Sequence, residues 1–233
     1  MTAPTFIASS ETASWAWEFG SAQSASPALS IESGDILVAI MSIHDVEDVP
    51  NISNSGAALT WTSQADLDAN PYTEVAVWTA VGDSTRSLTV SMQRTGTEGH
   101  RWGGIVYQFR GGNGLGNVAT AQASDAAPTV NITTTGADSA IVVLCSDREA
   151  SDGASRAWRT NAGALTEEAY SVNATFQTVY SGYHASAGTA GTYAVGLTAP
   201  NSQDYSIVAI EVLGVGAPPA VAPTHPLRSD NYF

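Results

Sequence analysis

The sequence is short of several residue types, and each shortage excludes a class of protein. It contains a single cysteine, Cys145, which excludes an intrachain disulfide framework and a cysteine-rich zinc site. Its eight basic residues are all arginine and stand against 22 acidic residues, giving a formal net charge of -14. Nucleic acid and anionic membrane surfaces repel such a chain, so we expect neither as a partner.

Long apolar runs are also missing. No stretch approaches the roughly 18 consecutive apolar residues that cross a membrane. The opening "MTAPTFIASSETASW" has neither a basic region nor an unbroken apolar region, so we expect no secretory signal. The run "SAIVVLCSD" surrounds Cys145 with apolar residues, which predicts a buried thiol and not a reactive one.

Helical periodicity is rare in the chain, whereas alternation with a period of two is frequent. In "SWAWEFG", Trp15, Trp17 and Phe19 would share one face of a strand. Turn-forming clusters separate the other strand candidates, which are 35–43, 58–63, 73–81, 86–92, 102–110, 128–134, 139–146, 164–171, 175–184, 192–198 and 204–213. The pattern predicts an all-β fold, a large antiparallel β-sandwich of the jelly-roll kind.

The two halves of the chain resemble each other, which indicates an internal structural echo. "GDILVAIMSIHD" from 34 matches "DSAIVVLCSDRE" from 138, and "LTWTSQ" and "RWGGIVYQFRGG" match "RAWRTN" and "DYSIVAIEVLGVG" in the same order. The halves could interleave in one sandwich over 1–214 or form two small sandwiches that meet near "NGLGN" at 113–117. We favour interleaving, because each half has few strands with which to close its own core. "RGGNGLGN" itself reads as a flexible connection.

The composition changes after residue 214. Residues 215–233 form a tail with four prolines, for which we expect an extended, polyproline-like arm. The tail ends in two aromatic residues, which are typical of a docking contact on a neighbouring subunit. The candidate assembly contacts are Pro218, Pro219, Pro223, Pro226, Tyr232 and Phe233.

Acidic residues follow two equivalent strands and form the best candidate metal site. Asp45 and Asp48 come after the strand at 35–43, and Asp147 comes at the end of its counterpart in the second half. Carboxylate oxygens are the ligands that Ca²⁺ prefers, so these three residues could hold a structural Ca²⁺. The alternative is a solvated loop, which we favour, and we expect no other cofactor.

No constellation for catalysis stands out. The sequence lacks a G-x-S-x-G motif, and the neighbouring acids Glu167 and Glu168 would point to opposite faces of a strand. We therefore expect a protein that is not an enzyme. Of the six tryptophans, Trp61 and Trp158 are equivalent in the echo and lie beside turns, so their rings are candidates for stacking on sugars. The alternative for both is core packing.

Four markers in the first half carry a family resemblance: Gly34–Asp35 before an apolar strand, Trp61–Thr62 after a loop, Trp78 within a strand, and Phe109–Arg110–Gly111 at a strand end. Over about residues 5–215, the succession "SGDILVAIM", "ALTWTSQ", "EVAVWTAVGDSTRSLTVSM" and "GGIVYQFRGG" resembles a group of β-sandwich proteins of tailed bacteriophages, which are minor tail, fibre or virion-surface proteins. The resemblance implies a concanavalin-like or jelly-roll sandwich that forms a structural or adhesive part of a virion.

These observations together predict a bacteriophage virion structural protein on the particle exterior. We expect it to be present in several copies and to be held by contacts with other capsid or tail proteins. Whether the head or the tail carries it stays open. The alternative function is that of a carbohydrate-binding module that recognises a glycan on the host surface.

Overall fold

The structure is a computed structural model that describes residues 2–11, 23–44, 50–67, 73–94, 101–148, 152–173 and 177–215. These residues form β-strands and their connections, with no α-helix among them, which confirms the predicted all-β class. No membrane-spanning helix occurs in these ranges. The strand expected around Trp15, the metal candidates Asp45 and Asp48, and the arm beyond Val215 lie outside the described residues.

The first half of the chain supplies the strands that precede residue 111. They are β1 (Thr5–Glu11), β2 (Gln23–Ala25), β3 (Leu29–Ile31), β4 (Ile36–Ile43), β5 (Asn51–Asn54), β6 (Thr62–Leu67), β7 (Glu74–Val81), β8 (Arg86–Leu88), β9 (Val90–Gln93) and β10 (Trp102–Arg110). Nine of the strand candidates correspond closely to observed strands in the two halves, whereas the short strands β2, β3 and β5 give no clear alternation in the sequence.

The second half supplies the remaining strands. They are β11 (Gly112–Ala126), β12 (Thr129–Thr133), β13 (Ala140–Asp147), β14 (Ala157–Trp158), β15 (Leu165–Asn173), β16 (Gln177–His184), β17 (Thr192–Ala199) and β18 (Gln203–Gly214). The expected flexible connection at "RGGNGLGN" is wrong, because most of it belongs to β11, which pairs with β18 along its length. Backbone hydrogen bonds to β18 hold this glycine-rich segment in the sheet.

Each half contains a five-stranded sheet with the same strand order. The order is β1-β10-β4-β7-β6 in the first half and β11-β18-β13-β16-β15 in the second. Smaller sheets follow the same plan, with β2-β9-β5 and β3-β8 in the first half and β12-β17-β14 in the second. Even the β-bulges agree, since one interrupts β6 between Ser63 and Ala65 and another interrupts β15 between Glu167 and Ala169. The internal structural echo is therefore confirmed.

Within each half, the chain passes back and forth between the large sheet and the small ones. β1, β4, β7 and β10 lie in the large sheet, and the intervening β2/β3, β5 and β8/β9 lie in the small ones. This alternation of antiparallel strands is the jelly-roll arrangement, so a jelly-roll-like sandwich occurs in each half. The expected interleaving of the halves is wrong, because every sheet takes its strands from one half only. The short strands missed by sequence reasoning supply the layer that closes each core.

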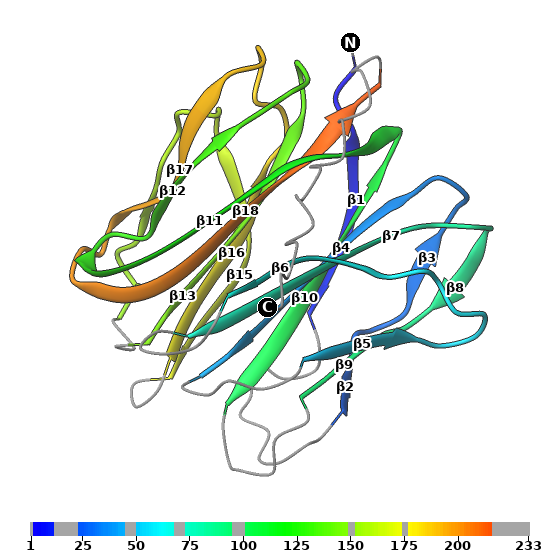
Figure 1. The fold of residues 1–233 in the computed structure, drawn as a ribbon, viewed down its shortest axis with the longest axis horizontal. Helices are drawn as coiled ribbons and strands as arrows, with labels where there is room; N and C mark the ends of the chain where they lie inside the picture. Colours follow the sequence, from blue (N-terminus) through cyan, green and yellow to red (C-terminus); the bar gives the residue numbers. More distant parts are fainter. Residues whose placement is uncertain are drawn as a thin grey trace, which may run out of the picture.

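The sheets form four layers, which follow one another across Figure 1 from β12 and β17 to β3 and β8. One core lies between the two five-stranded sheets and joins the halves, with Val38 and Ile40 facing Val142 and Leu144. A second core fills the first half between its large and small sheets. A third does the same in the second half. The molecule is therefore a stack of two sandwiches joined back to back by their large sheets.

Continuous apolar runs in the central strands explain this arrangement. In β4, Val38 and Ile40 belong to the core between the halves, whereas Leu37 and Met41 belong to the core of the first half. A strand that is covered on both faces needs apolar residues at successive positions and loses the alternation of a half-exposed strand. Every residue of β4 and of its counterpart β13 is buried.

Equivalent faces of the two halves meet, so the halves are related by a pseudo-twofold axis. Ser42 of β4 and Ser146 of β13 occupy equivalent positions, and their hydroxyls are hydrogen bonded to each other at 2.8 Å. Gln177 donates to both hydroxyls, at 2.6 and 2.9 Å. Thr73, which is equivalent to Gln177, donates to the carbonyl of Ser146 at 3.2 Å. Because all four side chains are buried, this network fixes the relative position of the halves.

Candidate functional site

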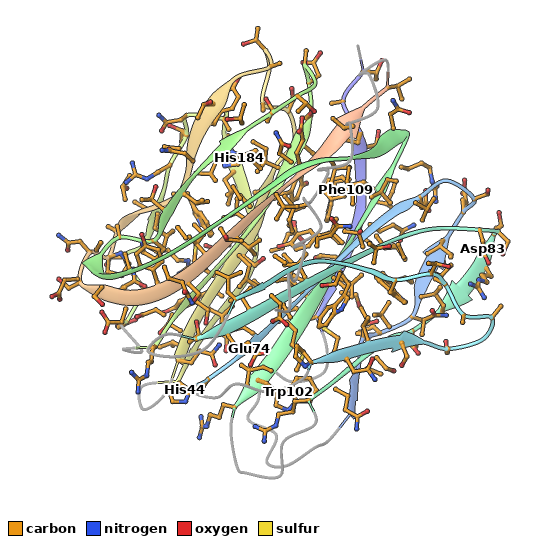
Figure 2. The ribbon with its side chains drawn as sticks, in the orientation of Figure 1. His44, Glu74, Asp83, Trp102, Phe109 and His184 are labelled. Atoms are coloured by element: carbon orange, nitrogen blue, oxygen red, sulfur yellow. The ribbon has the colours of Figure 1, made fainter. Side chains whose placement is uncertain are left out.

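The predicted metal site is only partly within the described residues. Asp147 lies at the end of β13, where its side chain is buried and its Oδ1 accepts a hydrogen bond from the backbone N–H of Asp204 at 3.1 Å. Figure 2 shows His44 and Glu74 at the same end of the stack. Within the described ranges, no three His, Cys, Asp or Glu side chains gather closely enough to hold a metal ion. The Ca²⁺ hypothesis stays a prediction.

Trp61 lies just before β6 and is tied to the loop that precedes it. Its indole Nε1–H donates to Oδ1 of Asn54 at 3.2 Å, and the same oxygen accepts from the backbone N–H of Leu59 at 2.9 Å. The ring packs partly buried against the core of the first half. Trp61 therefore helps to order the turn between β5 and β6, while part of its surface remains exposed.

Trp158 at the end of β14 belongs to a polar and aromatic cluster on the second half. Its Nε1–H donates to Oε2 of Glu167 at 2.8 Å. Arg156 forms a two-pronged ion pair with the same carboxylate, and its guanidinium lies 3.8 Å from the ring centroid of Tyr170. Tyr170 in turn stacks on Tyr180 at 5.6 Å. We call Arg156, Trp158, Glu167 and Tyr170 the Trp158 cluster.

In the Trp158 cluster, the charges of Arg156 and Glu167 neutralise each other in a direct ion pair. Burial alone would raise the pKa of Glu167, but hydrogen bonds from Arg156 and Trp158 outweigh it and leave this pKa below its usual value. Glu168 turns the other way and accepts a hydrogen bond from Ser9 at 2.5 Å, so the two acids have separate partners, as the alternation predicts. The sequence gives no sign of this cluster beyond the tryptophan itself.

The structure does not bring the two candidate tryptophans together. Their expected equivalence is wrong, because the strand registers place Leu165, at the start of β15, where the first half has Trp61, whereas Trp158 lies in β14. Trp61 packs against the core of the first half and Trp158 against that of the second, and both of the central sheets lie between these cores. A single ligand of small size therefore cannot contact both rings. Each would have to act in a separate site.

A pocket of about 220 Å³ opens on one flank of the interface between the halves. We call it the flank pocket. Its apolar lining includes Ile36, Val81 and Leu115, and its polar groups include Thr79 and Gln64, whose Nε2 donates to Oγ1 of Thr79 at 2.9 Å. The remaining lining residues are Thr60, Thr62, Ala80 and Gly114. None of these described lining residues is charged, although the chain carries a formal net charge of -14.

The opposite flank shows why this pocket is open. The strand registers make Leu115 equivalent to Phe6 and Thr79 equivalent to Tyr183. On the second flank, Phe6 and Tyr183 stack at 4.2 Å, and Phe109 contacts both rings edge-on. Two aromatic rings thus occupy on one flank the space that a leucine and a threonine leave open on the other. Nothing in the sequence alone reveals this difference, because it depends on the register of four strands.

The residues that carry the family resemblance have structural roles. Asp35 precedes β4 and is 1% exposed, and Arg110 at the end of β10 binds its carboxylate with two parallel hydrogen bonds. Gln108 and the backbone N–H of Glu32 also donate to this carboxylate, at 2.6 and 2.8 Å. Trp78 lies in the core of the first half. These residues lock a turn to a strand end and offer no reactive group.

Buried titratable groups elsewhere are also held in inert states. Cys145 is fully buried, which confirms the predicted environment, and burial raises the pKa of its thiol well above the usual value. His184, whose position in the second half is labelled in Figure 2, is buried with Nδ1 3.0 Å from the carbonyl oxygen of Gly163. Burial lowers the pKa of His184, which favours the neutral imidazole.

Comparisons with known proteins give no relative. No family model matches the chain, and neither a curated protein nor a solved structure matches it.

Proposed function

We propose that this chain is a structural protein of a bacteriophage virion, displayed in several copies on the particle exterior and held there by protein–protein contacts. The observation that carries the proposal is the structural role of the residues on which the resemblance to virion β-sandwich proteins depends. Asp35, Arg110 and Trp78 are committed to the fold and leave a rigid block in which the polar groups at the interface between the halves are hydrogen bonded to one another.

The position of the chain ends supports an anchor at one end of the block. Thr2 forms an isolated β-bridge with Val215, and Gly214 pairs with Gly112, so the C-terminal arm starts where β1 and β11 begin. The strand ends at Ile43 and Asp147, which lead into the acidic stretches, lie at the opposite end. The arm can thus attach the block while the acidic end faces solvent.

The strong negative charge favours an exterior position. A formal net charge of -14 on a chain of 233 residues repels packaged DNA, whereas an outer surface of this charge stays solvated and resists non-specific association. The proposal assigns no reaction to the protein and no cofactor beyond the possible Ca²⁺ near Asp147.

The test is the incorporation of an arm-deleted chain into particles. Deletion of residues 217–233 should abolish incorporation, whereas replacement of the same residues by a Gly/Ser segment of equal length controls for the loss of length alone and should fail equally. Quantification of the protein in purified particles measures both. Normal incorporation of the deleted chain would contradict the anchoring role.

A glycan-binding role is the second candidate, and the Trp158 cluster is the observation that favours it. The ring of Trp158 is partly exposed beside the guanidinium of Arg156 and the carboxylate of Glu167, so an apolar face and polar groups adjoin, as sugar recognition requires. Binding on a glycan array should be lost with Trp158→Ala and kept with Trp158→Phe. The substitution Trp61→Ala tests the other candidate ring separately.

A further inference from the structure

The flank pocket differs from its pseudo-symmetric counterpart by the size of two side chains. Phe6 and Tyr183 fill the closed flank, and Leu115 and Thr79 take their places on the open one. The scaffold around the two flanks is the same, since the strand order and the bulges agree. The closed flank therefore indicates which ligand would fit the open one. That ligand is an aromatic ring carried by an extended segment, as β1 carries Phe6.

The size and the lining of the flank pocket agree with such an occupant. A volume of about 220 Å³ lies below the roughly 300–1,000 Å³ of pockets for drug-sized ligands, so one or two side chains suit it better than a larger molecule. Ile36 and Leu115 offer an apolar lining, and the hydroxyl groups of Thr60 and Thr79 could bind a phenol. Val81 at the rim is 56% exposed, so apolar surface extends beyond the pocket itself.

The chain itself supplies a segment with this chemistry. Residues 216–233 contain one arginine and one aspartate, so their side-chain charges cancel in an otherwise strongly anionic chain. Tyr232 and Phe233 give them two adjacent aromatic rings. An aromatic segment with no net side-chain charge matches a pocket whose described lining is also uncharged. Two acidic surfaces from different copies would repel each other, and a contact through this segment avoids that repulsion.

The reach of this segment points to another copy. A polyproline-like segment extends by about 3.1 Å per residue, so the 16 residues from 216 to 231 span roughly 50 Å when extended. The flank pocket lies close to the start of the arm, because Gly214 pairs with Gly112 and Gly112 packs beside Ile36. Four prolines favour an extended conformation, and we expect an arm of that kind to end beyond the pocket of its own chain.

We propose that the flank pocket binds Tyr232 and Phe233 from the C-terminal arm of a neighbouring copy. The inference rests on the assembly role proposed above and names the contact through which copies join. Such a contact is head-to-tail, since an arm and a pocket are different surfaces, and it can therefore link more than two copies into a ring or a row.

The experiment uses two full-length variants that each lose one side of the contact. Tyr232→Ala with Phe233→Ala removes the rings from the arm. Thr79→Tyr with Leu115→Phe rebuilds the Phe6–Tyr183 pair in the open flank and should fill the pocket. Sedimentation velocity should show concentration-dependent self-association of the unchanged chain and at least a tenfold weaker association of each variant alone. A mixture of the two variants should form one-to-one dimers, because one keeps its pocket and the other its arm.

A surface variant controls for the case in which the chain with the filled pocket fails to fold. Val81→Arg places a charge on the exposed rim and should weaken association as strongly. Val172→Arg changes another exposed valine, which lies on β15 and is 42% exposed, and should leave association unchanged. Self-association that persists in both pocket variants overturns the proposal, and so does an unchanged chain that stays monomeric. If particles need the arm while the purified chain stays monomeric, the arm binds another virion protein. The proposed function then stands and this inference falls.

Discussion

Asp35 and Arg110 form a two-pronged ion pair across the start of β4 and the end of β10. Nε of Arg110 donates to Oδ1 of Asp35 at 2.8 Å, and Nη2 donates to Oδ2 at 2.9 Å. The third guanidinium nitrogen of Arg110, Nη1, lies 2.9 Å from Oε1 of Glu32 in the turn before β4. The guanidinium thus joins the turn before β4 to the end of the neighbouring strand β10 in the large sheet.

Removal of the charge on Asp35 should destabilise the fold. Asp35→Asn keeps the shape of the side chain but weakens hydrogen bonds from Arg110, Gln108 and Glu32 to a charged acceptor. We expect the free energy of unfolding to fall by about 1–3 kcal/mol, as measured by urea denaturation. Asp83→Asn is the matched control, because Asp83 pairs with Arg86 at an exposed site, where a loss under about 1 kcal/mol is expected. Equal losses of unfolding free energy in the two variants would show that Asp35 stabilises the fold no more than an exposed ion pair does.

Acid should reveal the same ion pair. Burial tends to raise the pKa of Asp35, yet hydrogen bonds from Arg110, Glu32 and Gln108 leave it below its usual value. A carboxyl whose pKa is lower in the folded than in the unfolded state stabilises the fold fully above the unfolded pKa of about 3.9. This contribution is lost as the pH falls from there through the folded pKa. Thermal unfolding between pH 6 and pH 2 should therefore show a steeper loss for the unchanged chain than for Asp35→Asn.

Glu211 in the second half should be as sensitive as Asp35 in the first. Strand registers place Ser139 and Glu211 where the first half has Asp35 and Gln108, so the acid has moved from the turn to the neighbouring strand. The fully buried carboxylate of Glu211 accepts from Ser139 at 2.7 Å and from the backbone N–H of Gly136 at 3.0 Å, and it also accepts from Asn117 and Thr135.

Glu211→Gln should cost about 2–3 kcal/mol, because the amide nitrogen of glutamine would face these donors. Chemical denaturation of the full chain measures the loss. Asp125→Asn on the exposed surface serves as the control, and a change within about 0.5 kcal/mol is expected there. A stable Glu211→Gln chain would mean that the surrounding donors relax around an uncharged group.

The thiol of Cys145 should be unreactive in the folded protein. The side chain is fully buried and burial raises its pKa. A reagent therefore cannot reach the sulfur, and the thiol stays in its protonated, unreactive form. A thiol-specific chromogenic reagent should react with one group per chain in denaturant and with none over the same time without it. Rapid reaction of the native chain would show that β13 opens locally.

The sequence predicts the strands and the echo well because both are local patterns. Runs such as "ILVAIMSI" of β4 and "AIVVLCSD" of β13 mark central strands, and their continuous apolar character already indicates a sheet covered on both faces. Applied fully, that signal would have favoured stacked sandwiches over interleaved halves. The short strands β2, β3 and β5 escape prediction because three or four residues hardly show a period.

The site features depend on register and are therefore beyond sequence reasoning. Neither the ion pair of Arg156 with Glu167 nor the flank pocket follows from composition or spacing, because both require residues of different strands to meet. The choice of Trp158 found one member of a real cluster, on the basis of a tryptophan beside a turn. Its role in binding remains a prediction that the array experiment tests.

The hydrogen bond between Ser42 and Ser146 bears on how such a chain could arise and on how a single half would behave alone. Two equivalent serines that meet on an axis are the mark of a surface that is complementary to itself. A single half, cut after Gly111 and expressed alone, would present that apolar face to water and should pair with a second copy of itself. The two covalently linked halves thus preserve within one polypeptide the geometry of a symmetric dimer.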